Sequence, residues 1–182
     1  MTRIFTLITL SSLLVGCATP PHPPALPGGD RGEVVAFVFT SVDCPIANAM
    51  APQLRRTIAE AKALGVKTCL VYPRAGITQA AMSTHASAYG LEAELIADPD
   101  KALVMELDAT VTPEGVVIEY TEGGGYEIRY RGRLSDLYSS IGNRRDRASS
   151  HEFREAILAT TRAESVSTPF PPAIGCMIER VP

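Results

Sequence analysis

The chain has 182 residues, of which 46% are hydrophobic and 20% are charged, close to the average for globular proteins. This length and composition predict one folded domain and exclude a largely disordered chain, a collagen-like repeat and a coiled coil. The formal net charge is −3. Because no long run of Lys and Arg occurs, nucleic acid is not expected as a partner.

The first residues have the pattern of a bacterial export signal. Arg3 gives a positive start, and the mostly apolar run over 4–15 is too short to span a membrane. The tetrad Leu-Val-Gly-Cys that ends at Cys17 resembles the lipobox of bacterial lipoproteins, whose cysteine receives a diacylglyceryl group before cleavage. We therefore predict a signal peptide over 1–16 and a lipid anchor on Cys17 in the bacterial cell envelope. By analogy with lipoprotein sorting, Ala18 favours the outer membrane, facing the periplasm.

A linker is expected between this lipid and the folded domain. Residues 17–32 contain five prolines and two adjacent glycines, which predict a semi-extended spacer. The folded domain is then predicted over 33–182.

Strands and helices are predicted to alternate along this domain. The continuous apolar run over 34–39 is typical of a strand buried on both faces, and a helix is expected from Pro45 to Gly65. Three consecutive glycines between the last two predicted strands indicate an antiparallel hairpin. Ser149 or Ser150 is expected to cap the last helix. The further strands are predicted at 66–72, 94–97, 116–120 and 127–131, and the further helices at 78–89, 101–107 and 150–162. This order predicts an α/β fold with a mixed sheet.

Cys44 lies where the first strand is predicted to end and the first helix to begin. Pro45 suits the first helical position, so Cys44 is expected at the helix N-cap. Unpaired amides and the positive end of the helix dipole stabilise a thiolate there, whereas Asp43 opposes it by like charge. The alternative is a buried, inert cysteine; we favour a redox-active one.

Four segments carry a resemblance to a known family. They are VFTSVDCPIAN at 38–48, VTPE at 111–114, YRGRLSD at 130–136 and GCMI at 175–178. Together they resemble the redoxin branch of the thioredoxin-like superfamily, exported bacterial proteins related to peroxiredoxins and thiol-disulfide oxidoreductases.

The resemblance extends over residues 33–179 and implies a thioredoxin-like fold, a central mixed β-sheet flanked by helices with an extended C-terminal tail. It also implies that Thr112 and Pro113 are joined by a cis bond, pack against the active-site cysteine and offer backbone groups to an extended disulfide substrate.

The chain departs from three relatives of this family. A thioredoxin has Cys-x-x-Cys, but the second position is Ala47 here, so no adjacent thiol resolves a mixed disulfide. In the peroxiredoxin pattern Pro-x-x-x-Thr/Ser-x-x-Cys, Ser41 supplies the hydroxyl, but Phe37 replaces the proline. Copper-assembly members use Cys-x-x-x-Cys, and Asn48 occupies the second position.

Cys176 is therefore the remaining candidate partner for Cys44. It follows a proline-rich tail that cannot be helical and that we expect to lie back over the domain. Two roles stay open. In the first role, Cys44 attacks a substrate and Cys176 resolves the intermediate. In the second role, the two cysteines form a structural disulfide, whose 133-residue loop would stabilise the fold by about 5 kcal/mol in the entropic model.

Other side chains are candidates for supporting roles. In the resembling family the segment that contains Arg131 and Arg133 approaches the active site, so either guanidinium is a candidate to support a thiolate or a bound anion. The alternative is that both are edge-strand charges. Ser41 and Asn48 join Thr112, Pro113 and the two arginines as predicted substrate-binding residues.

The sequence thus predicts a lipid-anchored, thiol-dependent oxidoreductase that acts on a protein thiol or disulfide or on a peroxide, without cofactor or metal. The alternative is a non-catalytic thioredoxin-fold binding or scaffold module with a structural disulfide. A third, weaker interpretation is a metal-handling protein that uses Cys44 and His85. Cys69 in a strand and His85 in a helix are otherwise expected to be packing or surface residues.

Overall fold

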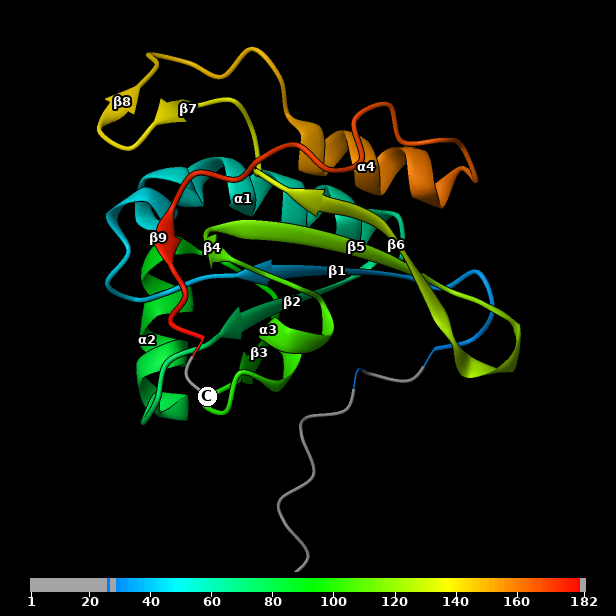
Figure 1. The fold of residues 1–182 in the computed structure, drawn as a ribbon, viewed down its shortest axis with the longest axis horizontal. Coiled ribbons are helices and arrows are strands. Elements are labelled where there is room, and N and C mark those ends of the chain that lie inside the picture. The colour runs from blue at the N-terminus through cyan, green and yellow to red at the C-terminus, as the bar shows by residue number, and fades with distance from the viewer. Residues whose placement is uncertain (1–25, 27–28, 181–182) are drawn as a thin grey trace, which may run out of the picture.

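A five-stranded mixed sheet forms the centre of the structure, with its strands in the order β3-β2-β1-β5-β6 (Figure 1). Strands β1, β2 and β3 are parallel, whereas β5 is antiparallel to both β1 and β6. The strands are β1 (Val34–Phe39), β2 (Lys67–Tyr72), β3 (Glu94–Ala97), β5 (Glu114–Tyr120) and β6 (Tyr126–Gly132). β1 is thus the middle strand, as its unbroken apolar run predicts.

This computed structural model describes residue 26 and residues 29–180. The predicted signal peptide, Cys17 and most of the linker lie outside the described residues and stay predictions. In the part of the chain that is described, no helix is both long and apolar enough to cross a membrane.

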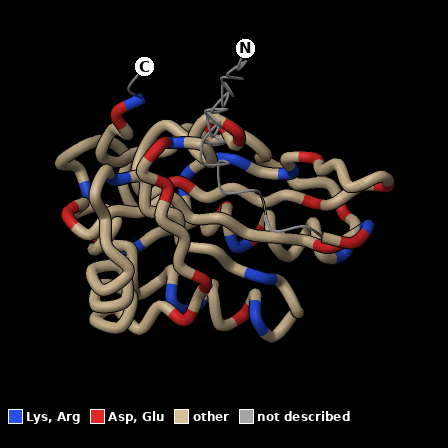
Figure 2. Tube along the Cα trace, turned by 90° about the horizontal axis from the view of Figure 1, so that it is seen from below, with Lys and Arg blue, Asp and Glu red and all other residues tan. Residues whose placement is uncertain are grey.

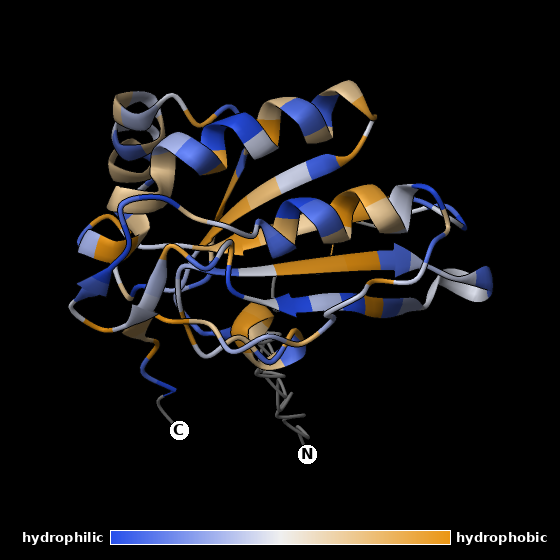
Figure 3. Ribbon diagram, turned by 90° about the horizontal axis from the view of Figure 1, so that it is seen from above, coloured by the Kyte–Doolittle hydropathy of each residue, from blue (hydrophilic) through white to orange (hydrophobic). Residues whose placement is uncertain are grey.

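Helices cover both faces of the sheet. Every residue of β1 is buried, and its side chains alternate between two hydrophobic clusters. Ala36 and Val38 pack with residues of α1, α2 and α4, whereas Phe37 and Phe39 pack with residues of α3. Figure 3 shows hydrophobic residues concentrated in the central strands between the helices. The helices are α1 (Pro45–Ala63), α2 (Gln79–Tyr89), α3 (Ala102–Glu106) and α4 (Glu152–Thr161).

Local signals determine most of these boundaries. Thr78 caps α2 by accepting a hydrogen bond from the Ala81 amide (3.2 Å), and α2 ends at Gly90 in the left-handed conformation (φ 64°). The predicted hairpin is confirmed, since β5 and β6 pair across the three glycines. The mixed sheet and its flanking helices confirm the predicted thioredoxin-like fold.

The predicted cap of the last helix is wrong. α4 begins at Glu152 with His151 at its N-cap, and no side chain caps it. The Ser149 hydroxyl donates to the carboxylate of Asp136 instead, and the Ser150 hydroxyl donates to Glu152 (2.8 Å). Both hydroxyls are thus bonded to carboxylates, Asp136 before the helix and Glu152 at its first position, and neither accepts from an amide of α4.

Two small sheets were not predicted. β4 (Val111–Thr112) pairs with β9 (Cys176–Met177), and β7 (Tyr138–Ser140) pairs with β8 (Asn143–Arg144), both antiparallel. β9 belongs to the C-terminal tail, which is extended as predicted and crosses back over the domain to β4 (red in Figure 1).

Two glycines allow this tail to approach the domain backbone to backbone. A Cβ atom on Gly132 would lie 2.2 Å from the Pro171 carbonyl oxygen, and one on Gly175 would lie 2.2 Å from the Thr112 carbonyl oxygen. The Arg131 amide also donates to the carbonyl of Pro169 (2.9 Å). The tail is therefore packed closely on the domain at two points.

Charged residues of both signs are interspersed along the described chain (Figure 2). This distribution agrees with the small formal net charge of −3.

Candidate active site

Cys44 lies at the N-cap of α1, as predicted from the Cys-Pro pair. Its backbone is extended (φ −82°, ψ 110°), Pro45 follows at the first helical position, and the Asn48 amide donates to the Cys44 carbonyl (3.0 Å). Because the turn begins directly after the buried strand β1, the thiol lies inside the domain, and the residue is only 2% exposed.

Cys176 is brought to Cys44 by the pairing of β9 with β4. In that pairing Cys176 is opposite Thr112 and Met177 is opposite Val111. The two sulfur atoms are 2.6 Å apart, and Cys176 is partly exposed, unlike Cys44. A disulfide has an S–S distance of about 2.05 Å, so the two thiols can bond without a rearrangement of the chain.

The Thr112–Pro113 peptide bond is cis and lies beside Cys44, as the resemblance implied. In its protonated form the Cys44 thiol donates to the Thr112 carbonyl (3.0 Å). Glu114, which sequence reasoning did not single out, holds the backbone before this bond, because its carboxylate accepts from the amides of Thr110 (2.6 Å) and Val111 (3.2 Å). Its position after Thr-Pro was the available signal.

The two thiols of the pair differ in acidity. Burial alone raises the pKa of Cys44, but hydrogen bonds from the Cys176 thiol and the Ala47 amide favour the thiolate and hold this pKa below its ordinary value. Burial and the hydrogen bond to Cys44 raise the pKa of Cys176. Asp43, expected to oppose the thiolate, is paired with Arg74. Cys44 is therefore the more acidic of the two thiols, and its thiolate would accept from the Cys176 thiol.

A buried chain of hydrogen bonds supports the loop before Cys44. The Tyr72 hydroxyl donates to His85 Nδ1 (2.9 Å), His85 Nε2 donates to Asn48 Oδ1 (2.9 Å), and Asn48 Nδ2 donates to the Val42 carbonyl (3.1 Å). Burial raises the pKa of Tyr72 to about 12 and lowers the pKa of His85, so both groups are neutral. Asn48 thus positions the active-site loop.

These bonds also bear on the metal-handling interpretation. Both ring nitrogens of His85 are already hydrogen-bonded, so neither is free to bind a metal ion. Among the described residues, no three His, Cys, Asp or Glu side chains are grouped as metal ligands.

The two candidate arginines have other partners. Arg131 pairs with Asp108 (2.8 Å), and its guanidinium lies 5.8 Å from the centre of the Phe170 ring in the tail. Arg133 pairs with the buried carboxylate of Glu152 on α4 (2.8 Å). Both lie on or next to the edge strand β6, so their contacts hold the tail and α4 against the sheet.

Cys69 is a packing residue, as predicted. It is fully buried in β2, and burial raises its pKa to about 12. Its thiol is therefore neutral and not accessible for exchange.

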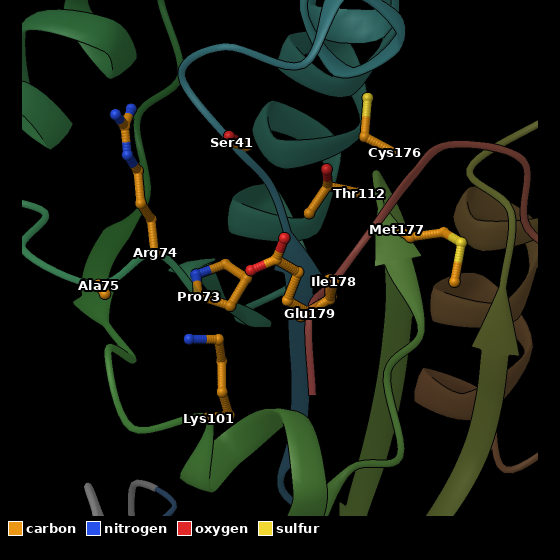
Figure 4. A pocket seen from close by; sticks show the side chains of 10 residues that line it. All are labelled: Ser41, Pro73, Arg74, Ala75, Lys101, Thr112, Cys176, Met177, Ile178 and Glu179. Atoms are coloured by element: carbon orange, nitrogen blue, oxygen red, sulfur yellow. The ribbon is translucent and has the colours of Figure 1, made fainter. Parts of the chain in front are cut away.

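Two hollows flank Cys176. A hollow of about 360 Å³ has a mixed lining that includes Ser41, Arg74 and Lys101, and Cys176 lies at its edge opposite Lys101 (Figure 4). An apolar hollow of about 480 Å³ opens on the other side of β9. Its lining consists mainly of apolar side chains, which are Pro45, Ile46, Tyr138, Ile141, Cys176 and Met177.

The fold and the site together define a thioredoxin-like protein with a cysteine at the first strand-to-helix turn, a facing cis-proline and a second cysteine in the C-terminal tail. Among solved structures it is similar to an uncharacterized conserved protein of Geobacillus kaustophilus, with 20% identity over 83% of this chain and 79% of that chain (TM-score 0.71). It is also similar to a hypothetical protein of Sinorhizobium meliloti, with 20% identity over 81% and 79% (TM-score 0.68).

These similarities show the fold. No protein-family model and no curated protein matches the chain.

Proposed function

We propose that the protein is a thiol-disulfide oxidoreductase of the redoxin type, in which Cys44 and Cys176 form a dithiol–disulfide couple. The observation that carries this proposal is the 2.6 Å distance between the two sulfurs, with Cys44 at the N-terminus of α1 and the Thr112 carbonyl 3.0 Å from its sulfur. A purely packing role would not require two thiols of opposite pKa shift in contact.

The reaction exchanges two electrons between this couple and an external dithiol or disulfide. When the Cys44–Cys176 disulfide accepts electrons, its S–S bond breaks and two external thiols become a disulfide. The two protons that the external thiols lose are taken up by Cys44 and Cys176, which end as thiols. The reverse reaction reduces an external disulfide.

Disulfides are favoured over peroxides as substrates. Phe37, at the position of the peroxiredoxin proline, is fully buried in β1 and contributes to the core. Arg131 and Arg133 are paired with Asp108 and Glu152, so the two guanidinium groups predicted to support a bound anion are engaged elsewhere.

The proposed location is the bacterial cell envelope, with the protein held to the outer membrane by lipid on Cys17. The support is the lipobox-like tetrad that ends at Cys17, followed by a proline-rich spacer. Three acyl chains give an effectively permanent attachment, whereas one chain binds only marginally. Cys17→Ser should leave the precursor unprocessed or release the protein from the membrane fraction; unchanged processing and partitioning would contradict the anchor.

The exchange itself is tested by equilibration with glutathione redox buffers, followed by alkylation and mass spectrometry. We expect the wild-type chain to form the Cys44–Cys176 disulfide reversibly, and Cys44→Ser and Cys176→Ser to lose it. Cys69→Ala is the matched control and should retain it, because Cys69 is fully buried in the core. A disulfide that forms but resists exchange would instead favour the binding or scaffold module.

A further inference from the structure

We infer that external thiols exchange with the cysteine pair at Cys176, not at Cys44, and that they approach through the apolar hollow as part of a protein segment with an apolar side chain beside its cysteine. This inference rests on the proposed function. It reverses the roles predicted from the sequence, because Cys176 carries the mixed disulfide and Cys44 is the thiolate that leaves and returns.

Access to the two sulfurs is the first argument. Thiol–disulfide exchange requires the attacking sulfur to approach along the extension of the S–S bond. Cys44 is 2% exposed and packs in the core, with the Thr112 carbonyl oxygen 3.0 Å from its sulfur. Cys176 is partly exposed and lines both hollows. An external thiolate therefore reaches the sulfur of Cys176 first.

The docked tail strengthens this argument. β9 already pairs with β4, and the Gly175 backbone is packed against the Thr112 carbonyl. An external extended segment thus cannot pair with β4 next to Cys44 while the tail is in place. The position that the resemblance assigned to a substrate is occupied by the chain's own Cys176.

The acidity of the two thiols agrees with this direction. A thiol of lower pKa is the better leaving group in disulfide exchange. When Cys176 carries the mixed disulfide it has no thiol proton to donate, but the Ala47 amide still favours the Cys44 thiolate against the effect of burial, whereas burial raises the pKa of Cys176. Attack on Cys176 releases Cys44, the member of the pair whose thiolate the site stabilises.

The step balances as follows. The external thiolate forms a bond to the Cys176 sulfur, the bond between Cys176 and Cys44 breaks, and its electron pair remains on the Cys44 sulfur as the thiolate. A second external thiolate then attacks the external sulfur of the mixed disulfide, and Cys176 departs and takes a proton from water. The external dithiol has become a disulfide, and the cysteine pair has gained two electrons.

The hollow indicates what kind of thiol fits. Its rim carries Ile141 and Met177, whose residues are 76% and 85% exposed, the highest values among the large exposed hydrophobic residues of the described chain. Cys176 and Arg144 border the same hollow. An apolar side chain next to the incoming cysteine would be removed from water in this hollow, which favours its binding. A small hydrophilic thiol has no apolar side chain to bury and gains no such free energy. Contiguous exposed apolar residues commonly mark such contact surfaces.

The entry sulfur is tested with the full chain in its disulfide form. A synthetic peptide with one cysteine is added, the reaction is quenched by acid after a short time, and peptide mapping locates the mixed disulfide. We expect the adduct on Cys176. An adduct on Cys44 would overturn the inference and leave the proposed function intact, whereas no exchange with any thiol would overturn both.

The approach surface is tested with two peptides that differ only beside the cysteine, one with Leu and one with Ser. The Leu peptide should react about tenfold faster, as partial burial of one leucine side chain implies. Ile141→Ser should remove this preference. Leu64→Ser is the matched control, since Leu64 is 44% exposed at the far end of α1. Equal rates for both peptides, or a preference unchanged in Ile141→Ser, would refute the apolar approach.

Discussion

Replacing Gly175 by Ala should weaken the Cys44–Cys176 disulfide without touching either sulfur. A Cβ atom at this position would lie 2.2 Å from the Thr112 carbonyl oxygen and 2.6 Å from the Thr112 carbonyl carbon. Both are backbone atoms, so no side-chain rotation relieves the contact. In the dithiol form no covalent bond holds β9 against β4, so we expect the tail to shift and relieve the contact. The disulfide fixes β9 against β4, so the strain stays in that form.

The size of the effect follows from this difference between the two forms. Overpacking of a well-packed site costs about 1–3 kcal/mol. If the strain falls on the disulfide form alone, the oxidation equilibrium shifts about 5- to 150-fold toward the dithiol, and the reduction potential rises by about 20–60 mV.

The assay is titration with glutathione redox buffers, and Gly115→Ala is its control. A Cβ atom on Gly115 would lie 2.4 Å from the Phe153 ring, beneath α4. This change should lower the free energy of unfolding but leave the reduction potential unchanged. If Gly175→Ala lowered the free energy of unfolding as much as Gly115→Ala does and left the reduction potential of the cysteine pair unchanged, β9 would not be held against Thr112 as described.

Three further predictions concern the buried polar groups. Because burial lowers the pKa of His85, the imidazole binds a proton more readily in the unfolded chain than in the folded one. The free energy of unfolding should therefore be constant above about pH 6.5 and decrease as the pH falls below that value. His85→Gln should reduce this pH dependence, as measured by urea unfolding at several pH values. Burial raises the pKa of Asp136, but hydrogen bonds led by the Ser149 hydroxyl lower it to about 2. Asp136→Asn should therefore reduce the free energy of unfolding at pH 7 by about 2 kcal/mol. In the wild type the same stabilisation should be lost as the pH falls from about 4 through 2. Asn48→Ala should cost about 1–3 kcal/mol, because the Val42 carbonyl and His85 Nε2 lose their partner; an unchanged urea midpoint would contradict this.

The parts of the fold that the sequence predicted well are specified by local signals. A fully apolar run produced β1, Cys-Pro marked the start of α1, and Thr78 and Gly90 bounded α2. Each of these signals acts within a few residues of the element it determines. The pairing of Cys44 with Cys176 was predicted in another way. Position 47, where a thioredoxin has its second cysteine, is an alanine, so Cys176 remained as the candidate partner.

The parts that could not be predicted depend on distant contacts. β4 and β9 are two residues long, too short for any periodic pattern, and they pair across more than sixty residues of chain. The hydrogen bonds from Tyr72 through His85 to Asn48 join three separate elements, so no spacing in the sequence indicates them. The cap of α4 failed for the same reason, since Asp136 takes the Ser149 hydroxyl from outside the helix.

The position of β1 has a mechanical consequence. The linker leads directly into this strand, and hydrogen bonds between residues 32–33 and Tyr120 continue the sheet to its very start. A pull on the linker therefore enters the domain through the strand that has a neighbour on each side, β2 and β5. To extract it, two ladders of hydrogen bonds must shear at once, whereas a load on an edge strand would open one ladder pair by pair.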